Sequence, residues 1–515
     1  MPIPLVAVRL DAAPPTIADV AAVAAGARVE LGPAAVAMIL ASRAVVDRLV
    51  NGDTLIYGLN TGLGHMRNER VSVDELRDYQ VAIVAAHDSA IGEPLPTAVV
   101  RAAMFVRLAG IARGGSGASP GVARQLVGLL NAGIHPVVPA VGSVGASDLM
   151  HMAAIGAVML GGGRAEVAGE VMPGAQALAR AGLEPVVLEP KDGLALISAN
   201  GVSIGAGALV AARAARTARA ADLVLAVSLE ATRGNPSVIE AAVAVAKPVP
   251  GQAASAAALR AFLAGSDRWT PAGVASVQDP LSFRVGPQVH GAFREFTRFL
   301  TEHVTIELAA SDDNPLVVAG EDRMISNGNF HPIAMALAAD ALRPAAAHIA
   351  QLSDRRMNHL WTVLVSDPAL LTPEGIRDAA RYGGPLLRYA AAARTAELRA
   401  LADPVTLDIG PLDLGVEDHA TNAPFAVLRS DEALDLLQDV LAVELLIAAV
   451  AVRRNAASLG RLGSGTAAAV AEVDAILAGL GDARDAARLH RTMRDALLDR
   501  ILAAAEAATS GDPAG

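Results

Sequence analysis

The sequence predicts a mainly α-helical protein built around a long helical bundle. Of its 515 residues, 53% are apolar, 18% are charged and only 3% are aromatic. This composition is typical of a folded chain with a large buried core and not of a disordered one. With so few aromatic residues, the core must consist mostly of Ala, Val and Leu. Alanine is the best helix former and lets helices approach one another closely, so packed helices are the expected result.

Helical stretches account for most of the chain. Glycines and prolines interrupt them, at Gly32-Pro33, at 114–117 and at 383–385. A small hairpin is expected at 161–171, where polar residues alternate. Arginines at 213, 216 and 219 form a stripe, which is either a solvated face or a surface that pairs with another subunit. The expected helices cover 15–50, 74–86, 101–111, a run to 130, 202–232, 332–363, 373–401, 430–456 and 466–507, before a frayed tail at 511–515.

Charge and cysteine content exclude several classes of protein. The net charge is −11 and there is no basic cluster, so nucleic acid is not an expected partner. The absence of cysteine excludes disulfides, a thiolate nucleophile and a zinc–thiolate site. The first residues lack the features of a signal peptide. The most apolar helix, at 434–452, carries Asp435, Asp439 and Glu444, which favours a bundle helix over a membrane span. We therefore expect a soluble, cytoplasmic protein with no membrane partner.

A loop rich in small residues is the most distinctive stretch. It reads Val137-Val-Pro-Ala-Val-Gly-Ser-Val-Gly-Ala-Ser-Asp-Leu-Met-His151. Small residues in series permit close backbone approach and unusual backbone angles. Pro136 and Pro139 fix the approach, and Asp148 precedes an apolar run, as at the start of a buried helix. On composition alone, an ordinary surface loop is the alternative.

Within this loop, Gly142-Ser-Val-Gly-Ala-Ser-Asp-Leu149 resembles a segment of the aromatic amino acid ammonia-lyase family. That family includes histidine, phenylalanine and tyrosine ammonia-lyases and the related aminomutases. Its members carry Gly-Ser-Val-Gly-Ala-Ser-Gly-Asp-Leu, in which Ala-Ser-Gly cyclises to a methylidene-imidazolone (MIO) electrophile. This chain lacks one glycine. The resemblance implies that Ala146, Ser147 and Asp148 form the MIO precursor, with no external cofactor.

A second segment, Tyr57-Gly-Leu-Asn-Thr-Gly-Leu-Gly64, closely matches the family's Tyr-Gly-x-Asn-Thr-Gly-x-Gly motif. In the family this tyrosine takes the β-proton of the substrate. The resemblance therefore implies that Tyr57 is the catalytic base and that Asn60 and Gly64 bind substrate. A tyrosine serves as a base when its pKa is lowered. A packed tyrosine with a bonded hydroxyl is the alternative that the residue alone allows.

Two further positions concern the side-chain pocket and the electrophile. Ala86-His87 corresponds to the pair that sets substrate selectivity, which is Ser-His in histidine ammonia-lyases. His87 thus implies a polar, histidine-like substrate. Ser198 stands where the family has an asparagine that helps to hold the electrophile's oxygen, and Asn200 is a candidate replacement for it.

The remaining matches lie in the second half of the chain. Gln278-Asp-Pro-Leu-Ser-Phe-Arg284 is similar to the family's Gln-Asp-x-Tyr-Ser-Leu-Arg, with Leu281 in place of the tyrosine. Gln278 and Arg284 are thus implied to bind substrate, because arginine is well suited to hold a carboxylate with two hydrogen bonds. By the same resemblance, Asn329 would bind the carboxylate and Phe330 would pack beside the ring.

Three acidic segments complete the comparison. Glu397 stands where histidine ammonia-lyases place a glutamate, and is either a site residue or a salt-bridge partner. Gly415-Val-Glu-Asp-His-Ala420 resembles a segment that lies behind the family's active site. Asp312-Asp313 precedes Asn-Pro in a turn-like context, so no metal site is expected.

Two functional hypotheses follow. The first is an ammonia-lyase that eliminates ammonia from an aromatic-type L-amino acid, with histidine favoured, through an MIO-like electrophile. The second is a homologue without MIO, acting either as a cofactor-free lyase on a more acidic substrate or as a non-catalytic small-molecule-binding protein. An aminomutase outcome stays open. The resemblance also implies a mixed N-terminal domain (1–200), a helical bundle (201–515) and a homotetramer.

Overall fold

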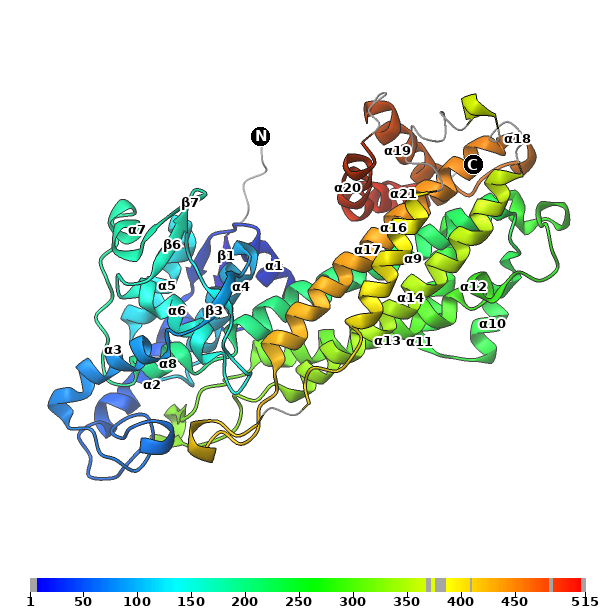
Figure 1. Cartoon of the computed structure of the whole chain (residues 1–515). Coiled ribbons are helices and arrows are strands. Elements are labelled where there is room, and N and C mark those ends of the chain that lie inside the picture. Colours follow the sequence, from blue (N-terminus) through cyan, green and yellow to red (C-terminus); the bar gives the residue numbers. More distant parts are fainter. Residues whose placement is uncertain (1–6, 367–371, 376–385, 408–409, 481–484, 511–515) are drawn as a thin grey trace. The chain divides into compact units, whose positions relative to one another are not determined.

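The computed structural model describes residues 7–366, 372–375, 386–407, 410–480 and 485–510. Helices dominate it, and the predicted mainly α-helical fold is confirmed (Figure 1). The chain forms two compact units. The first consists of Met1–Ala212, Leu300–Ala339 and Pro404–Leu428, and the second of Arg213–Phe299, Asp340–Asp403 and Arg429–Gly515.

The predicted division at residue 200 thus needs a correction. The first unit ends its first segment at residue 212, but it also takes in two later segments, 300–339 and 404–428. The reason lies in helix length. Four of the five boundaries between the units fall within long helices, namely α9 (Gly201–Thr232), α13 (Gly286–Ala309), α14 (Ile333–Val365) and α17 (Ala423–Arg454), and the fifth lies between residues 403 and 404.

The first unit combines helices with short strands. β1 (Val8–Leu10) pairs in parallel with β2 (Val29–Leu31), and all other pairs are antiparallel. The predicted hairpin is confirmed as β6 (Arg164–Val167) and β7 (Glu170–Pro173), to which β4 (Ile134–Pro136) adds a third strand. The others are β3 (Ile91–Pro94), β5 (Pro139–Val141), β8 (Leu316–Val318) and β9 (Arg323–Ile325).

The helices of the first unit begin and end where local chemistry favours it. Thr16 and Asp19 form a capping box at the start of α1 (Ile17–Ala24). β2 separates α1 from α2 (Pro33–Leu49), which begins with a proline in its first turn. Gly133 adopts a left-handed φ of 66° after α5 (Pro120–Ala132). The other helices are α3 (Leu76–His87), α4 (Thr97–Ala112), α6 (Leu149–Met159), α7 (Gly174–Arg180) and α8 (Asp192–Ile197).

The second unit is a bundle of helices. Its centre contains a buried ion pair between Arg356 on α14 and Glu444 on α17, with 2.6 Å between Nε and Oε1. The predicted arginine stripe on α9 pairs within the chain, because Arg213 contacts Asp431, Arg216 contacts Asp499 and Arg219 contacts Glu506. The further helices are α10 (Ala241–Ala246), α11 (Pro250–Phe262), α12 (Leu281–Arg284), α16 (Leu387–Ala400), α18 (Ala456–Leu459), α19 (Ser464–Leu480), α20 (Ala486–Ala496) and α21 (Leu502–Ser510).

Part of the predicted helix 373–401, namely 376–385, lies outside the described residues, as does the tail 511–515. Two stretches, Asp192–Thr232 and Ile333–Val365, are long and apolar enough to cross a membrane by length and composition. Their most apolar windows are 94% and 67% buried. Core helices of folded proteins have the same composition, and packing within this protein accounts for both.

Candidate active site

The loop from Gly142 to Asp148 connects β5 to α6 and has an unusual backbone. Gly145 and Ser147 both have positive φ values, 79° and 61°. This left-handed region is rarely occupied by residues with a side chain, so Ser147 is held there by its surroundings. A Cβ on Gly145 would lie 2.2 Å from the Thr421 hydroxyl, which leaves no room for a side chain.

Main-chain hydrogen bonds fix the loop on both sides. The Ser147 N–H donates to the Phe330 carbonyl at 3.1 Å, and the Asp148 N–H donates to the Ala199 carbonyl at 2.8 Å. On the other side, the Asn422 N–H donates to the Val144 carbonyl at 2.7 Å. These partners come from three separate segments of the first unit. The loop is therefore a point at which segments distant in the sequence meet.

Asp148 is fully buried at the start of α6. Its carboxylate accepts two hydrogen bonds from Ser203, from the backbone N–H at 2.7 Å and from the hydroxyl at 2.8 Å. Burial raises the pKa of Asp148 to about 6, although the hydrogen bonds from Ser203 oppose this shift. Asp148 is thus an anchor between the loop and α9.

We expect Asp148→Asn to change the pH dependence of stability. The folded-state pKa of about 6 exceeds 3.8, the ordinary pKa of an aspartate side chain, so between these values the folded protein binds more protons than the unfolded chain. The contribution of Asp148 to stability then falls as pH rises from 4 to 6. Asparagine carries no charge, so the variant should be more stable above pH 6, by up to about 3 kcal/mol, and similar to the parent near pH 4. Urea unfolding across this pH range measures the difference; parallel pH profiles would contradict the prediction.

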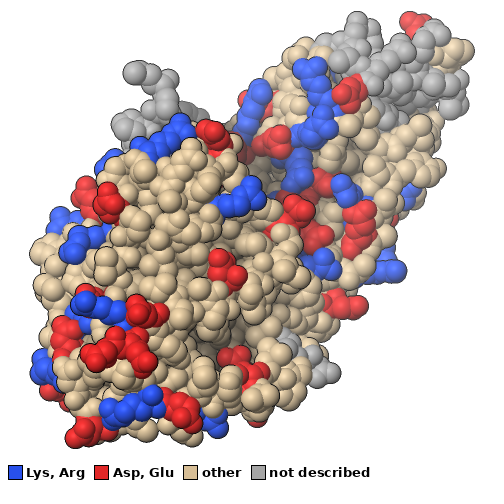
Figure 2. Space-filling model, turned by 60° about the vertical axis from the view of Figure 1, so that its left-hand side comes forward, with Lys and Arg blue, Asp and Glu red and all other residues tan. Residues whose placement is uncertain are grey.

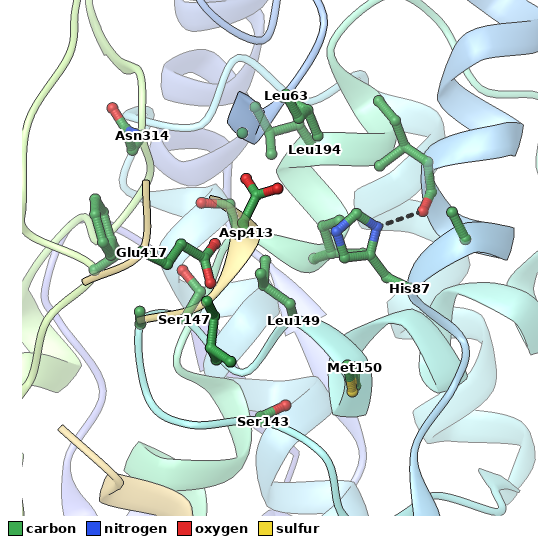
Figure 3. A pocket seen from close by; sticks show the side chains of 18 of the residues that line it. Leu63, His87, Ser143, Ser147, Leu149, Met150, Leu194, Asn314, Asp413 and Glu417 are labelled. Carbon is green, nitrogen blue, oxygen red and sulfur yellow. Dashed lines mark hydrogen bonds between the residues drawn. The ribbon is translucent and has the colours of Figure 1, made fainter. Parts of the chain in front are cut away.

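A cavity of about 650 Å³ opens beside this loop. It is lined by seven of the predicted site residues and by others that the sequence did not indicate. The predicted ones are Tyr57, Gly64, His87, Ala146, Ser147, Ser198 and Phe330. The others include His65, Tyr79, Ser143, Met150, Asn314, Asp413 and Glu417. Figure 3 shows part of this wall, with His87 on α3 facing Asp413 and Glu417.

Tyr57 lies in this cavity, but its pKa differs from the expectation. Burial is the largest cause and raises the pKa of the Tyr57 hydroxyl, with smaller contributions from Glu417 and Asp413. The N–H of Gly64 donates to the hydroxyl oxygen at 3.4 Å and opposes the shift. The phenol is therefore protonated at neutral pH in the free protein. The lowered pKa that favours a tyrosine base is therefore not present in the free protein.

His87 has a defined tautomer. Its Nδ1 lies 2.8 Å from the Ile83 carbonyl oxygen, which only accepts hydrogen bonds, so Nδ1 must carry the proton. Nε2 of the neutral ring is then a hydrogen-bond acceptor. Because His87 lines the cavity, this nitrogen is available to receive an N–H group of a ligand.

Two carboxylates enter the cavity from the segment 404–428. Asp413 accepts hydrogen bonds from His65, at 2.9 Å from its N–H and at 2.7 Å from its ring Nδ1. The pKa of Glu417 is raised, mainly by burial and further by the charge of Asp413, while His87 opposes the shift. In Figure 3 both side chains lie between Asn314 and His87. The site therefore attracts a cationic group such as an ammonium.

Three asparagines considered from the sequence, Asn60, Asn200 and Asn329, do not line the cavity. Asn60 is buried and ties the Tyr57 loop together, because its side chain accepts from the Ile56 N–H and donates to the Thr54 carbonyl. Asn200 is also buried beside Asp312 and does not line the cavity, so it does not replace the family's asparagine. The cavity lining includes neither Asn60 nor Asn329, whose amide lies 3.5 Å from the Ser311 carbonyl.

Three predicted residues belong to the second unit. Arg284 ends the short helix α12, and Gln278 precedes it in a loop. Glu397 on α16 forms an exposed ion pair with Arg394 at 2.7 Å, as the salt-bridge alternative expects. Their roles in substrate binding stay predictions. The described residues contain no group of three or more acidic, histidine or cysteine side chains suited to a metal.

The sequence contained signals for some of the missed residues. Tyr79, Ile83 and His87 recur every fourth residue on α3, so they share one face of the helix, and that face lines the cavity. Glu417 stands in the segment that was interpreted as lying behind the site. The fold places residues 404–428 in the first unit, and Glu417 thereby reaches the cavity.

Comparison with known proteins shows the family to which this chain belongs. Residues 16–475 match the family model described as aromatic amino acid lyase. The histidine ammonia-lyase of Gloeobacter violaceus is 39% identical over 456 residues, covering 86% of this chain and 87% of that protein. The chain therefore belongs to the aromatic amino acid lyase family. Within that family it is a carbon–nitrogen lyase, the class to which its histidine ammonia-lyase relatives belong.

Solved structures show the same fold. Histidine ammonia-lyase from Trypanosoma cruzi superposes with a TM-score of 0.85 at 27% identity, covering 98% of this chain and 97% of that one. An ergothioneine-degrading enzyme, ergothionase from Treponema denticola, gives a TM-score of 0.85 at 26% identity, covering 97% and 99%. Relatives with different substrates thus share this architecture, and the substrate must be argued from the cavity.

Proposed function

We propose that this protein eliminates the α-amino group of a histidine-type amino acid to give an α,β-unsaturated acid. The observation that carries the proposal is the cavity that joins Tyr57, His87 and Glu417 around the glycine-rich loop. The names of its relatives, histidine ammonia-lyases at 36–39% identity, support the same substrate class.

Each of these side chains has a chemical task in such an elimination. Nε2 of His87 accepts an N–H of the substrate's imidazole, and the carboxylates of Asp413 and Glu417 attract its ammonium group. The oxygen of Tyr57 takes the proton from the β-carbon while the bond between the α-carbon and nitrogen breaks. The electron pair forms the double bond, and the amine leaves. Because phenolate is the form that accepts a proton, binding of a cationic substrate helps by lowering the pKa of Tyr57.

The family generally uses MIO to assist departure of ammonia, supplied by Ala-Ser-Gly. The residues present here do not fit that group. The third position is Asp148, whose N–H is bound to Ala199 and whose carboxylate is bound to Ser203. No step above therefore depends on MIO.

This mismatch favours a second candidate substrate, a histidine derivative whose nitrogen carries three alkyl groups. A trialkylammonium leaves as a neutral amine without further activation. The solved relative described as degrading ergothioneine, which is itself a trimethylammonium derivative of a thiohistidine, supports this candidate. The reaction at the β-carbon would be the same.

Incubation with L-histidine, L-phenylalanine, L-tyrosine, trimethylhistidine and ergothioneine tests both candidates. Ultraviolet absorbance reports the conjugated product, and released ammonia or trimethylamine is measured separately. Product from L-histidine supports the first candidate, and product from the trimethylated compounds alone supports the second. A β-amino acid product would indicate an aminomutase. No reaction with any of them would contradict the proposed function and favour a binding protein.

We expect His87→Leu to reduce kcat/KM for histidine-type substrates by about 10–100-fold, because the substrate's N–H loses its acceptor in a closed site. Phenylalanine, which has no such N–H, is the internal control. The ratio of the two kcat/KM values measures the effect. An unchanged ratio would show that His87 does not contact the substrate's side chain.

A homotetramer in the cytoplasm is also proposed. Apolar side chains such as Phe296 and Tyr389 are exposed on helices of the second unit, as at surfaces that associate. Light scattering should give about four times the chain mass of 52.3 kDa; a monomer would contradict this assembly.

The chain is acidic overall, and basic and acidic side chains are interspersed on the face in Figure 2, so nucleic acid is not a proposed partner. Cell fractionation tests the location.

A further inference from the structure

We propose that residues 146–148 remain an open, uncyclised peptide, and that the retained Ser147 hydroxyl is a substrate-binding group of the cavity. The family motif Ala-Ser-Gly-Asp-Leu assigns ring closure to its glycine and leaves the following aspartate free for other contacts. Here a single residue, Asp148, stands between Ser147 and Leu149. Its contacts decide which of the two tasks it performs.

Asp148 performs the aspartate's task. It directly precedes α6, and its carbonyl accepts the first hydrogen bond of that helix from the Met152 N–H at 2.9 Å. Its carboxylate is buried and held by both hydrogen-bond donors of Ser203. The residue is therefore fixed at its backbone and at its side chain, and the position that the family fills with glycine has no counterpart.

Ring closure requires a different arrangement of the same atoms. The nitrogen of residue 148 would form a bond to the carbonyl carbon of Ala146. One water would leave from that carbonyl oxygen, and a second from the Ser147 hydroxyl. In this structure the N–H of Asp148 instead donates to the Ala199 carbonyl at 2.8 Å. Turning this nitrogen toward Ala146 would break that bond and pull the carboxylate away from Ser203.

The rest of the loop opposes such a movement. The Val144 carbonyl accepts from the Asn422 N–H, and the Gly145 carbonyl accepts from the Thr421 hydroxyl at 2.8 Å. The Ser147 N–H is bound to the Phe330 carbonyl. Residues on both sides of Ala146 are therefore held in place. An uncyclised Ser147 keeps its hydroxyl, and Ser147 lines the cavity beside Glu417 and Phe330. This hydroxyl offers one donor and two acceptor positions to a polar substrate.

Intact-mass measurement of the denatured full-length chain tests the first half of the proposal. We expect the mass calculated from the sequence, and an unmodified peptide containing residues 142–150 after digestion. Loss of one or two waters, about 18 or about 36 Da, would overturn the proposal, because both dehydration and cyclisation are covalent changes. This result does not depend on whether the proposed substrate is right.

Insertion of a glycine between Ser147 and Asp148 tests whether the missing glycine is the reason that the peptide stays uncyclised. The inserted residue takes the ring position and leaves Asp148 to bind Ser203, so we expect this variant to lose about 36 Da from its own sequence mass. The matched control carries the same insertion with Ser147→Ala and cannot lose the second water. A folded insertion variant that loses no mass would show that the missing glycine is not the reason that the peptide stays uncyclised. Asp148→Gly, which frees the third position without lengthening the loop, gives the same test if the insertion does not fold.

The kinetic test of Ser147 rests on the proposed function. For an open peptide, Ser147→Ala should raise KM about three- to tenfold with little change in kcat, as expected for the loss of one hydrogen bond. Loss of kcat by several orders of magnitude would overturn the binding role, because it would assign Ser147 to the chemical step. If no substrate is found, the mass measurements still decide whether the loop is open.

Discussion

Replacing Tyr57 by phenylalanine is expected to reduce kcat of the elimination by about 10²–10⁴-fold, the usual contribution of a positioned acid–base group. The change removes one oxygen atom and leaves the ring in place. Among the described residues, the Tyr57 hydroxyl has one hydrogen bond, a long one from the Gly64 N–H at 3.4 Å, so little stability should be lost. The measurement is the initial rate of product absorbance at saturating substrate, with circular dichroism to confirm that the fold is intact.

Tyr79→Phe is the matched control for this experiment. Tyr79 lines the same cavity from α3, and burial likewise raises the pKa of its hydroxyl. Removal of its hydroxyl should alter KM by less than about tenfold and leave kcat nearly unchanged, because the residue has no assigned proton transfer. If Tyr79→Phe lost as much activity as Tyr57→Phe, the assignment of Tyr57 as the base would fail.

The raised pKa of Tyr57 adds a condition on pH. A base must be deprotonated to act, and burial keeps the phenol protonated over most of the neutral range. In the free enzyme the active fraction therefore increases as pH rises toward this pKa. We expect kcat/KM to increase with pH on the alkaline side of neutrality, and this slope should disappear in Tyr57→Phe. A decrease with rising pH in the parent enzyme would contradict a tyrosine base.

The site could be predicted from sequence where its residues are close together in the chain. The loop 142–148 and the segment 57–64 carry recognisable motifs, and both reach the cavity. The residue type alone did not show whether a side chain serves structure or chemistry. Asn60 occupies a family position, but its amide closes the Tyr57 loop through two backbone hydrogen bonds. A sequence pattern cannot show which partners are within reach of an amide.

Long-range folding explains the other differences. The helical fold follows from composition and periodicity, which are local properties of the chain. The return of residues 404–428 to the first unit depends on how long helices pack, and this return brings Asp413 beside His65, which is 348 positions away in the sequence. The same return brings Glu417 to the cavity lining.

The second large effect that we expect is a loss of stability when the buried ion pair behind the loop is broken. Arg107 on α4 and Asp313 are both fully buried, and their side chains approach to 2.7 Å. Asp313→Ala leaves the Arg107 charge buried with only Asp312, at 3.7 Å, to oppose it. We expect the free energy of unfolding to fall by about 3–5 kcal/mol, the usual result of removing one partner of a buried ion pair. Urea or guanidinium unfolding followed by circular dichroism measures the change.

Two control variants distinguish the loss of the Arg107–Asp313 ion pair from the general effect of a mutation on stability. The double variant Arg107→Met with Asp313→Leu removes both charges and keeps the space filled, so it should be more stable than Asp313→Ala. Arg9→Ala breaks the exposed pair with Asp11 and should cause little measurable change. A loss below about 1 kcal/mol in Asp313→Ala would show that this pair does not stabilise the first unit.

The same substitution should also affect the site. Asp312 and Asp313 directly precede Asn314, which lines the cavity, and the Asp313 carbonyl accepts from the Asn327 amide at 3.0 Å. Asp312 in turn accepts from the Asn200 N–H at 2.7 Å, next to Ala199, whose carbonyl binds the Asp148 N–H. Loss of the buried ion pair therefore loosens the loop 142–148 through two connected contacts, from Asp312 to Asn200 and from Ala199 to Asp148. We expect activity in Asp313→Ala to fall at temperatures at which the variant is still folded, whereas Arg9→Ala should retain full activity.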